Sequence, residues 1–217
     1  KAIGALIELG ATVDACSITS LPETLAAYQV ISSAEASTNL ARYDGIRYGR
    51  RDRSVSWDMG FEELVIAARS SGFGPEVKRR IMLGSCVLSR EYAELMRKAE
   101  MVRSNITVQL EALFGRFDAL LAPTSPTVAF AFGAHTDDQL SMHSSDILTI
   151  PANLAGIPSL SVPCGLSDDL PVGLQIMGKR FSEALLLRIA SAYERAVGFP
   201  GLPFLKAHSD LVGVVQP

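Results

Sequence analysis

The sequence is poor in the residues and segments that mark metalloproteins, secreted proteins and membrane proteins. Its cysteines, Cys16, Cys86 and Cys164, form no CxxC pair, and its three histidines stand apart in the chain. This usage argues against a disulfide framework and a metal site, and it fits the reducing cytoplasm. No apolar run approaches the roughly 20 residues that a membrane-spanning helix needs, so we expect no membrane partner.

Charge of one sign is also scarce. The formal net charge is −3, and 20% of the residues are charged against 48% hydrophobic. A nucleic-acid-binding surface would need a basic patch, and a disordered chain would have fewer apolar residues. The composition is that of a globular protein, and 217 residues can bury a sizeable core.

The predicted elements mix helices with short apolar strands, which indicates an α/β fold. Helices are expected at residues 2–9, 22–43, 59–70, 74–89, 92–114, 147–155 and 182–197, and strands at residues 12–18, 119–122, 160–162 and 172–176. Ser167, Asp168 and Asp169 are expected in the turn between the last two strands.

The helix at residues 22–43 carries a polar stripe at helical spacing that includes Tyr28, Glu35 and Asn39. Its other faces have mostly small residues, which let a helix approach its neighbours closely, so we expect it to lie deep in the fold. The stripe then faces either a cavity or solvent, and the pattern leaves both interpretations open.

The helix at residues 74–89 carries an arginine on its apolar side. At about 100° per residue, Arg80 falls among Val77, Ile81 and Gly84, while Arg79 points the opposite way into solvent. An unpaired buried charge is very costly, so this position predicts an anion close to Arg80.

Two sources of that anion are open. Glu35 or Glu76 would form an internal ion pair, since buried charges normally pair within the protein. A ligand carboxylate is the alternative, because a guanidinium can donate two parallel hydrogen bonds to it. Asp146 has a similar ambiguity: it either caps or begins the helix at residues 147–155, or it binds the ammonium group of a ligand.

No motif places a nucleophile. The sequence has no G-x-S-x-G elbow, Walker loop or GxGxxG. Cys164, in VPCG, has no base beside it in the sequence, so we interpret it as a small buried hydrophobe. The residues alone predict an α/β chain with a possible binding pocket and no visible nucleophile.

Four stretches together resemble the C-terminal part of amidase signature enzymes, and only residues 198–217 match weakly. The stretches are AEASTNLARYDGIRYG, GFGPEVKRRIMLGSCVLS, FDALLAPTSPTVAF and SSDILTIPANLAGIPSLSVPCGLSDDLPVGLQIMG. The first two resemble specifically the A subunits of glutamyl-tRNA(Gln)/aspartyl-tRNA(Asn) amidotransferases.

The resemblance implies a mixed β-sheet core flanked by helices, with residues 1–217 forming the C-terminal portion of a single amidase domain. It also implies glutamine hydrolysis by a serine–serine–lysine triad, which replaces histidine in proton transfer. The family's carboxylate-binding arginine falls on Arg80, its ammonium-binding aspartate on Asp146 and a pocket tyrosine on Tyr28.

The same resemblance implies partners. The released ammonia passes to a B subunit, which uses ATP and Mg to amidate Glu-tRNA(Gln) or Asp-tRNA(Asn), and a small C subunit clasps the assembly. We therefore expect glutamine and the B and C subunits as partners, with aminoacyl-tRNA reached only through the B subunit. No cofactor is expected in this segment.

The departures from the family pattern concern the triad, which nothing in this chain matches. The chain also opens without Met or a signal peptide, in a helix followed by a strand, so we expect a fragment that is inactive alone. Thr38 replaces a usual serine and Cys86 an often-found tyrosine, both as packing changes. Two rival functions stay open: a stand-alone amidase for a neutral amide, and an inert folding or subunit-docking module.

Overall fold

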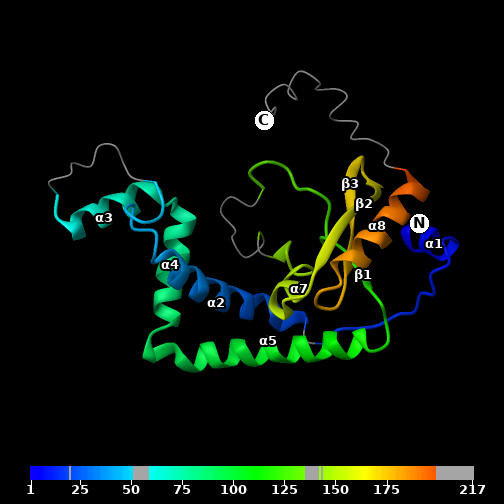
Figure 1. Cartoon of the computed structure of the whole chain (residues 1–217), viewed down its shortest axis with the longest axis horizontal. Helices are drawn as coiled ribbons and strands as arrows, with labels where there is room; N and C mark the ends of the chain where they lie inside the picture. Colours follow the sequence, from blue (N-terminus) through cyan, green and yellow to red (C-terminus); the bar gives the residue numbers. More distant parts are fainter. Residues whose placement is uncertain (20, 51–58, 135–141, 143, 199–217) are drawn as a thin grey trace, which may run out of the picture. The chain divides into compact units, whose positions relative to one another are not determined.

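The computed structural model describes residues 1–19, 21–50, 59–134, 142 and 144–198 (Figure 1). The chain divides into two compact units, one formed by Lys1–Thr19 and Thr107–Pro217 and the other by Ser20–Ile106. The boundary falls within one long helix, α5 (Ala93–Phe114). The expectation that the chain belongs to one amidase domain stays a prediction.

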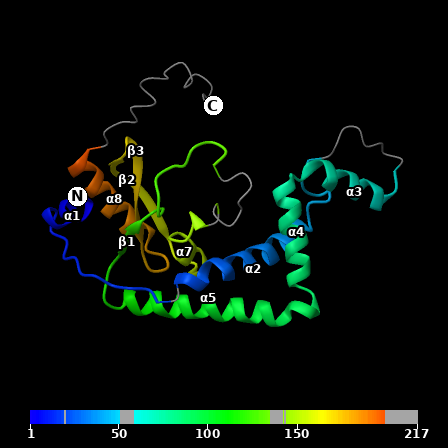
Figure 2. The ribbon, with the colours of Figure 1, turned by 180° about the vertical axis from the view of Figure 1, so that it is seen from behind.

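The first unit contains a three-stranded antiparallel sheet in the order β1-β3-β2 (Figure 2). The strands are β1 (Leu120–Pro123), β2 (Ser159–Ser167) and β3 (Leu170–Met177). Asp168 and Asp169 join β2 to β3, with φ of 50° and 61°. Two left-handed residues match the right-handed twist of a hairpin, and aspartate tolerates that conformation. The predicted turn is confirmed at these two residues, whereas Ser167 still belongs to β2 and pairs with Leu170.

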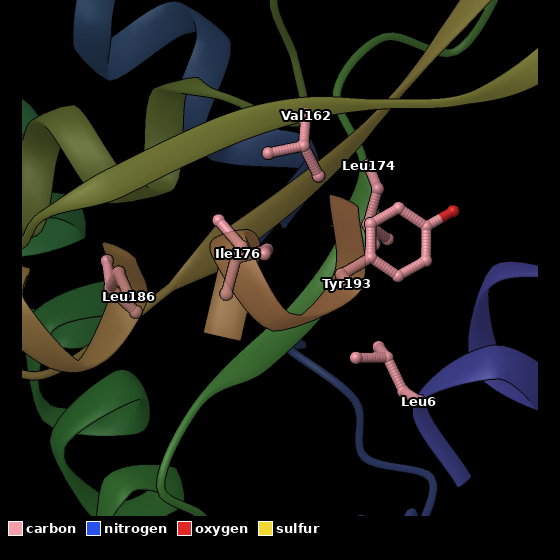
Figure 3. Packing of buried hydrophobic residues seen from close by; sticks show 7 residues of the cluster. Leu6, Val162, Leu174, Ile176, Leu186 and Tyr193 are labelled. Carbon is pink, nitrogen blue, oxygen red and sulfur yellow. The ribbon is translucent and has the colours of Figure 1, made fainter. Parts of the chain in front are cut away.

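One hydrophobic core holds this sheet to α8 (Glu183–Val197) and α1 (Ala2–Glu8) (Figure 3). The buried residues of the core are Leu6, Val162, Leu174, Ile176, Leu186, Ala190 and Tyr193. Leu186, Ala190 and Tyr193 recur at helical spacing on α8, which places all three on its sheet-facing side. A short helix, α7 (Ile150–Ala155), precedes β2 and ends at Gly156, whose φ of 64° suits glycine.

The second unit is helical. Its elements are α2 (Leu21–Leu40), α3 (Phe61–Gly72), α4 (Pro75–Val87), the 3₁₀ turn η1 (Arg90–Tyr92) and the first part of α5. Pro22 and Pro75 lie in the first turns of α2 and α4, where the missing N–H costs nothing. Ala27, Ile31 and Ala34 are buried on α2.

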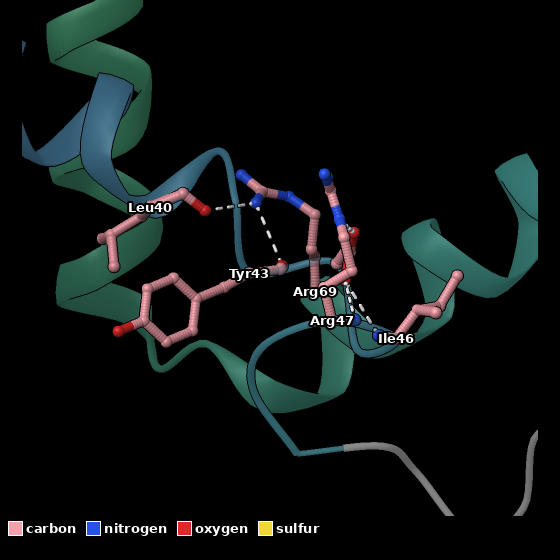
Figure 4. A network of polar contacts seen from close by, with 6 residues as sticks. Leu40, Tyr43, Ile46, Arg47 and Arg69 are labelled. Atoms are coloured by element: carbon pink, nitrogen blue, oxygen red, sulfur yellow. Dashed lines mark hydrogen bonds and ion pairs between the residues drawn. The ribbon is translucent and has the colours of Figure 1, made fainter.

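The turn after α2 is fixed by side chains that bind backbone groups. The carboxylate of Asp44 accepts hydrogen bonds from the backbone N–H groups of Ile46 (2.9 Å) and Arg47 (2.8 Å). Arg69 reaches from α3 to donate to the carbonyl oxygens of Leu40 (2.7 Å) and Tyr43 (3.3 Å) (Figure 4). The end of α2 and the turn that follows it are thereby tied to α3, and the Leu40 carbonyl accepts from Arg69 in addition to the backbone N–H of Tyr43.

The predicted α/β class is confirmed, and helices occur in each described segment where they were expected. The strand predicted at residues 12–18 is wrong, since this exposed segment has no strand conformation. A strand needs a neighbour for its backbone hydrogen bonds, and none of the three described strands pairs with it. In the part of the chain that the structure describes, no helix is long and apolar enough to cross a membrane.

Candidate substrate-binding site

Tyr28 and Arg80, two of the three predicted site residues, lie on helices of the second unit that pack against each other, α2 and α4. The contact is closest at Gly84, where a Cβ atom would collide with the backbone oxygen of Ser33. The hydroxyl groups of Ser37 and Ser85 share a hydrogen bond of 3.1 Å across the same contact. The predicted close approach of this helix is confirmed, because only small residues permit it.

Arg80 forms an ion pair within its own helix. Its Nε donates to Oε1 of Glu76 over 2.8 Å. Arg79 binds the same carboxylate twice, from Nε to Oε2 at 2.7 Å and from Nη2 to Oε1 at 2.8 Å. The hydrogen bonds from Arg79, and then the one from Arg80, lower the pKa of Glu76 to about 2.

The predicted contrast between a buried Arg80 and a solvent-facing Arg79 is wrong. Their side chains are 30% and 33% exposed, because both fold back onto Glu76 one turn earlier. The apolar side that was expected to surround Arg80 is buried less completely than expected, since Val77 and Ile81 are only half-buried. Only Gly84 is buried in this helix, since its contact with α2 is centred on that glycine.

The internal ion pair that the sequence left open is present, with Glu76 as the partner. Glu35 instead lies 3.6 Å from Nη1 of Arg103. Glu76 engages only the Nε edge of the Arg80 guanidinium, and no other carboxylate of the described residues pairs with Arg80. The terminal amino groups of Arg80 thus retain the geometry that binds a ligand carboxylate.

Tyr28 is half-buried and lies beside this guanidinium. The hydrogen bond to Glu76 raises the pKa of Arg80, and the Tyr28 hydroxyl adds to the rise. The structure therefore brings Tyr28 and Arg80 together from positions 52 residues apart in the chain. A phenol beside a partly free guanidinium offers a donor and a flat apolar surface to a small ligand.

Asp146 belongs to the first unit, where it lies in a turn ahead of α7. Its backbone oxygen accepts hydrogen bonds from the N–H groups of Thr149 (2.9 Å) and Ile150 (3.1 Å). The helix begins at Ile150 with Thr149 as its N-cap residue. The alternative in which Asp146 caps or begins the helix is therefore wrong, because the preceding turn delays the helix start. The Asp146 side chain is exposed.

A pocket of about 840 Å³ includes Asp146 in its wall. Hydroxyl groups converge there from separate segments: Thr124 Oγ1 and Ser161 Oγ share a hydrogen bond of 2.6 Å, and Ser125 Oγ donates to the backbone oxygen of Ser145 over 3.3 Å. Neither Thr124 nor Ser125 was singled out from the sequence, although both line this pocket. Their position directly after the strand β1 was the available signal.

The structure offers little to a metal or a thiol nucleophile. Among the described residues, no group of three or more His, Cys, Asp or Glu side chains could hold a metal ion. Burial raises the pKa of the Cys164 thiol, which disfavours the reactive thiolate. This shift supports the interpretation of Cys164 as a packing residue.

The fold and the matched residues define the class of this protein. The model of the amidase family matches residues 1–187, and the chain belongs to that family. The predicted membership of the amidase signature enzymes is therefore confirmed.

Relatives give a narrower likeness. The chain is 49% identical over 206 residues to the A subunit of glutamyl-tRNA(Gln) amidotransferase from Exiguobacterium sp., a match that covers 94% of this chain and 42% of the relative. It is 50% identical over 196 residues to the protein of the same name from Symbiobacterium thermophilum, covering 90% and 40%. The chain thus spans about two fifths of the length of the curated relatives it matches.

Solved structures agree with this likeness. The A subunit of glutamyl-tRNA(Gln) amidotransferase from Thermotoga maritima superposes with a TM-score of 0.65 at 39% identity, over 93% of this chain and 38% of that one. A 6-aminohexanoate cyclic dimer hydrolase superposes with a TM-score of 0.61 at 21% identity, over 93% and 42%. The second likeness concerns the fold alone.

Proposed function

We propose that this chain is the C-terminal, substrate-recognising part of the glutaminase subunit of a tRNA-dependent amidotransferase. In this proposal Arg80 binds the α-carboxylate of glutamine, Asp146 binds its ammonium group and Tyr28 lines the pocket. The identity of about one half with amidotransferase A subunits, over nine-tenths of the chain, supports this substrate class.

The observation that carries the proposal is the partial engagement of Arg80. Glu76 binds only its Nε and Tyr28 lies beside it, so Glu76 leaves the terminal amino groups available to a substrate. Arg80 and Asp146 have opposite charges, as do the two ends of the glutamine backbone. Binding both ends would fix the side-chain amide in space, and such positioning lowers the barrier of a following reaction.

The chemical step requires a serine–serine–lysine triad, and no segment of this chain matches the family's triad residues. We propose that the serine–serine–lysine triad lies in the remaining part of the full-length enzyme, which corresponds to the part of the relatives that this chain does not span. The chain alone would then be inactive. The ammonia would pass to a B subunit that uses ATP and Mg to amidate Glu-tRNA(Gln) or Asp-tRNA(Asn), with a C subunit completing a cytoplasmic heterotrimer.

The test is ammonia release from glutamine by the full-length protein in complex with its B and C subunits. Arg80→Leu should lower kcat/KM on the order of 10²-fold, because it removes a charge-assisted contact to the substrate. Arg97→Leu is the matched control, since Arg97 forms an exposed 2.7 Å ion pair with Glu94 on α5. It should leave turnover nearly unchanged. Wild-type turnover by folded Arg80→Leu enzyme would refute the proposal.

A further inference from the structure

Two arginines bind the carboxylate of Glu76 in different ways. Arg79 binds it side-on, with both Nε and Nη2 on the two carboxylate oxygens, whereas Arg80 contributes Nε alone. The spacing explains the arrangement, because Arg79 and Arg80 follow Glu76 by three and four residues and therefore lie on the same helix face. All three side chains belong to α4, so the cluster is formed within one helix.

The charges of this cluster do not cancel. One carboxylate faces two guanidinium groups, so the cluster keeps one net positive charge. The two hydrogen bonds from Arg79 occupy both oxygens of Glu76, which leaves Oε1 to hold Arg80 by a single bond. The uncompensated charge therefore belongs chiefly to Arg80, which gives Glu76 one hydrogen bond where Arg79 gives it two.

We propose that Glu76 is a positioning residue, which orients the Arg80 guanidinium so that its terminal amino groups present a fork to the substrate carboxylate. This inference rests on the proposed function. A long side chain that is held at Nε loses less conformational freedom on binding, so the hydrogen bond from Arg80 to Glu76 improves affinity for the ligand. Glu76 itself does not touch the substrate.

Tyr28, on the neighbouring helix α2, limits the orientations open to the Arg80 guanidinium. Glu76 acts from within α4 and Tyr28 acts from α2, and both contribute to the raised pKa of Arg80. A side chain contacted from two helices has few orientations left. The close approach of α2 and α4 at Gly84, one turn from Arg80, keeps these two constraints together.

The experiment compares two substrates in the fully assembled, full-length enzyme. Glutamine carries the carboxylate that Arg80 is proposed to bind, and 4-aminobutanamide has the same amide and ammonium groups without it. Glu76→Ala should raise the KM for glutamine about tenfold and leave kcat within about twofold. Its effect on 4-aminobutanamide should be absent. Glu76→Gln keeps an acceptor oxygen for Arg80 Nε, so it should restore part of the glutamine affinity.

The matched control is Glu94→Ala, which removes an acid that forms an exposed ion pair with Arg97 on α5. It should leave kcat and KM unchanged for both substrates. Equal losses on both substrates with Glu76→Ala would mean a merely structural role and overturn the inference, as would unchanged glutamine kinetics. A glutamine-selective loss with Arg80→Leu alone would uphold the proposed function while this inference fails. If Arg80→Leu shows no such selectivity, the proposed function itself fails.

Discussion

At the scale of single residues, the site depends on which charged groups have donors or acceptors that are not already bound by other residues of the protein. Arg80 is tied to Glu76 through one nitrogen, and Asp146 is an exposed acid in the wall of a hydroxyl-lined pocket. No described residue forms an ion pair with the Asp146 carboxylate. Both groups therefore keep charge available for a ligand.

The ammonium role of Asp146 can be tested with a substrate that lacks that group. Asp146→Asn removes the charge and keeps the shape, so the KM for glutamine should rise about tenfold or more. The monoamide of glutaric acid, which is glutamine without its amino group, should be hydrolysed equally by both enzymes. Steady-state kinetics of both enzymes with each of the two substrates measures these effects. An equal loss on both would assign Asp146 to folding rather than to ammonium binding.

Glu76 also makes stability depend on pH in a defined direction. Its pKa falls from 4.5 to about 2 on folding, so its ion pairs contribute fully at pH above 4.5 and are lost as the pH drops through about 2. The free-energy difference between wild type and Glu76→Gln should be constant above pH 4.5 and should shrink as the pH falls from 4.5 to about 2. Urea denaturation across a pH series measures this. A difference that grows on acidification would contradict the assignment.

At the scale of elements, the crossing of α2 and α4 decides where the residues of the second unit lie. The small-residue pattern of α2 was sufficient to predict a close helix contact, and Gly84 supplies its counterpart on α4. The surroundings of Arg80 could not be predicted, because helical periodicity gives the direction of a side chain but not how far the neighbouring helix extends. The hairpin at Asp168 and Asp169 was predictable, since its turn chemistry is local.

Gly84→Ala should loosen this crossing. The new Cβ would meet backbone atoms of Ser33 and lie 2.6 Å from Cβ of Ser37, and backbone cannot move aside as a flexible side chain can. We expect a loss of about 1–3 kcal/mol in the free energy of unfolding. Gly72→Ala is the control, since nothing lies within 4 Å of a Cβ at that helix position. Chemical denaturation compares them, and equal stability of both variants would contradict the close contact.

At the scale of the whole molecule, the chain contains two compact units, and only one of them holds the sheet. Composition and periodicity predicted the mixture of helices and strands, but they could not reveal this division. The pattern along residues 12–18 suited a strand, yet a strand exists only where another strand offers it hydrogen bonds. Which segments meet is decided by long-range contacts, and the sequence pattern does not record them.

The core between α8 and the sheet should stabilise the first unit specifically. Leu186 is 2% exposed in this core, whereas its neighbour Leu187 is 60% exposed. In the full-length protein, Leu186→Ala should cost about 2–5 kcal/mol, and Leu187→Ala about 0.5 kcal/mol or less. Hydrogen exchange should then accelerate in β2, β3 and α8 while α2 and α4 keep their protection. Equal acceleration in both units would contradict separate cores.

The central claim is that Arg80 meets the carboxylate of the substrate, and a double-change cycle tests it most directly. One change removes the arginine, as Arg80→Leu, and the other removes the carboxylate, as 4-aminobutanamide in place of glutamine. Each change alone should lower kcat/KM on the order of 10²-fold, and both together should cost about as much as one, because they abolish the same contact. If the two losses multiply to about 10⁴-fold, the groups act independently and Arg80 does not bind the substrate carboxylate.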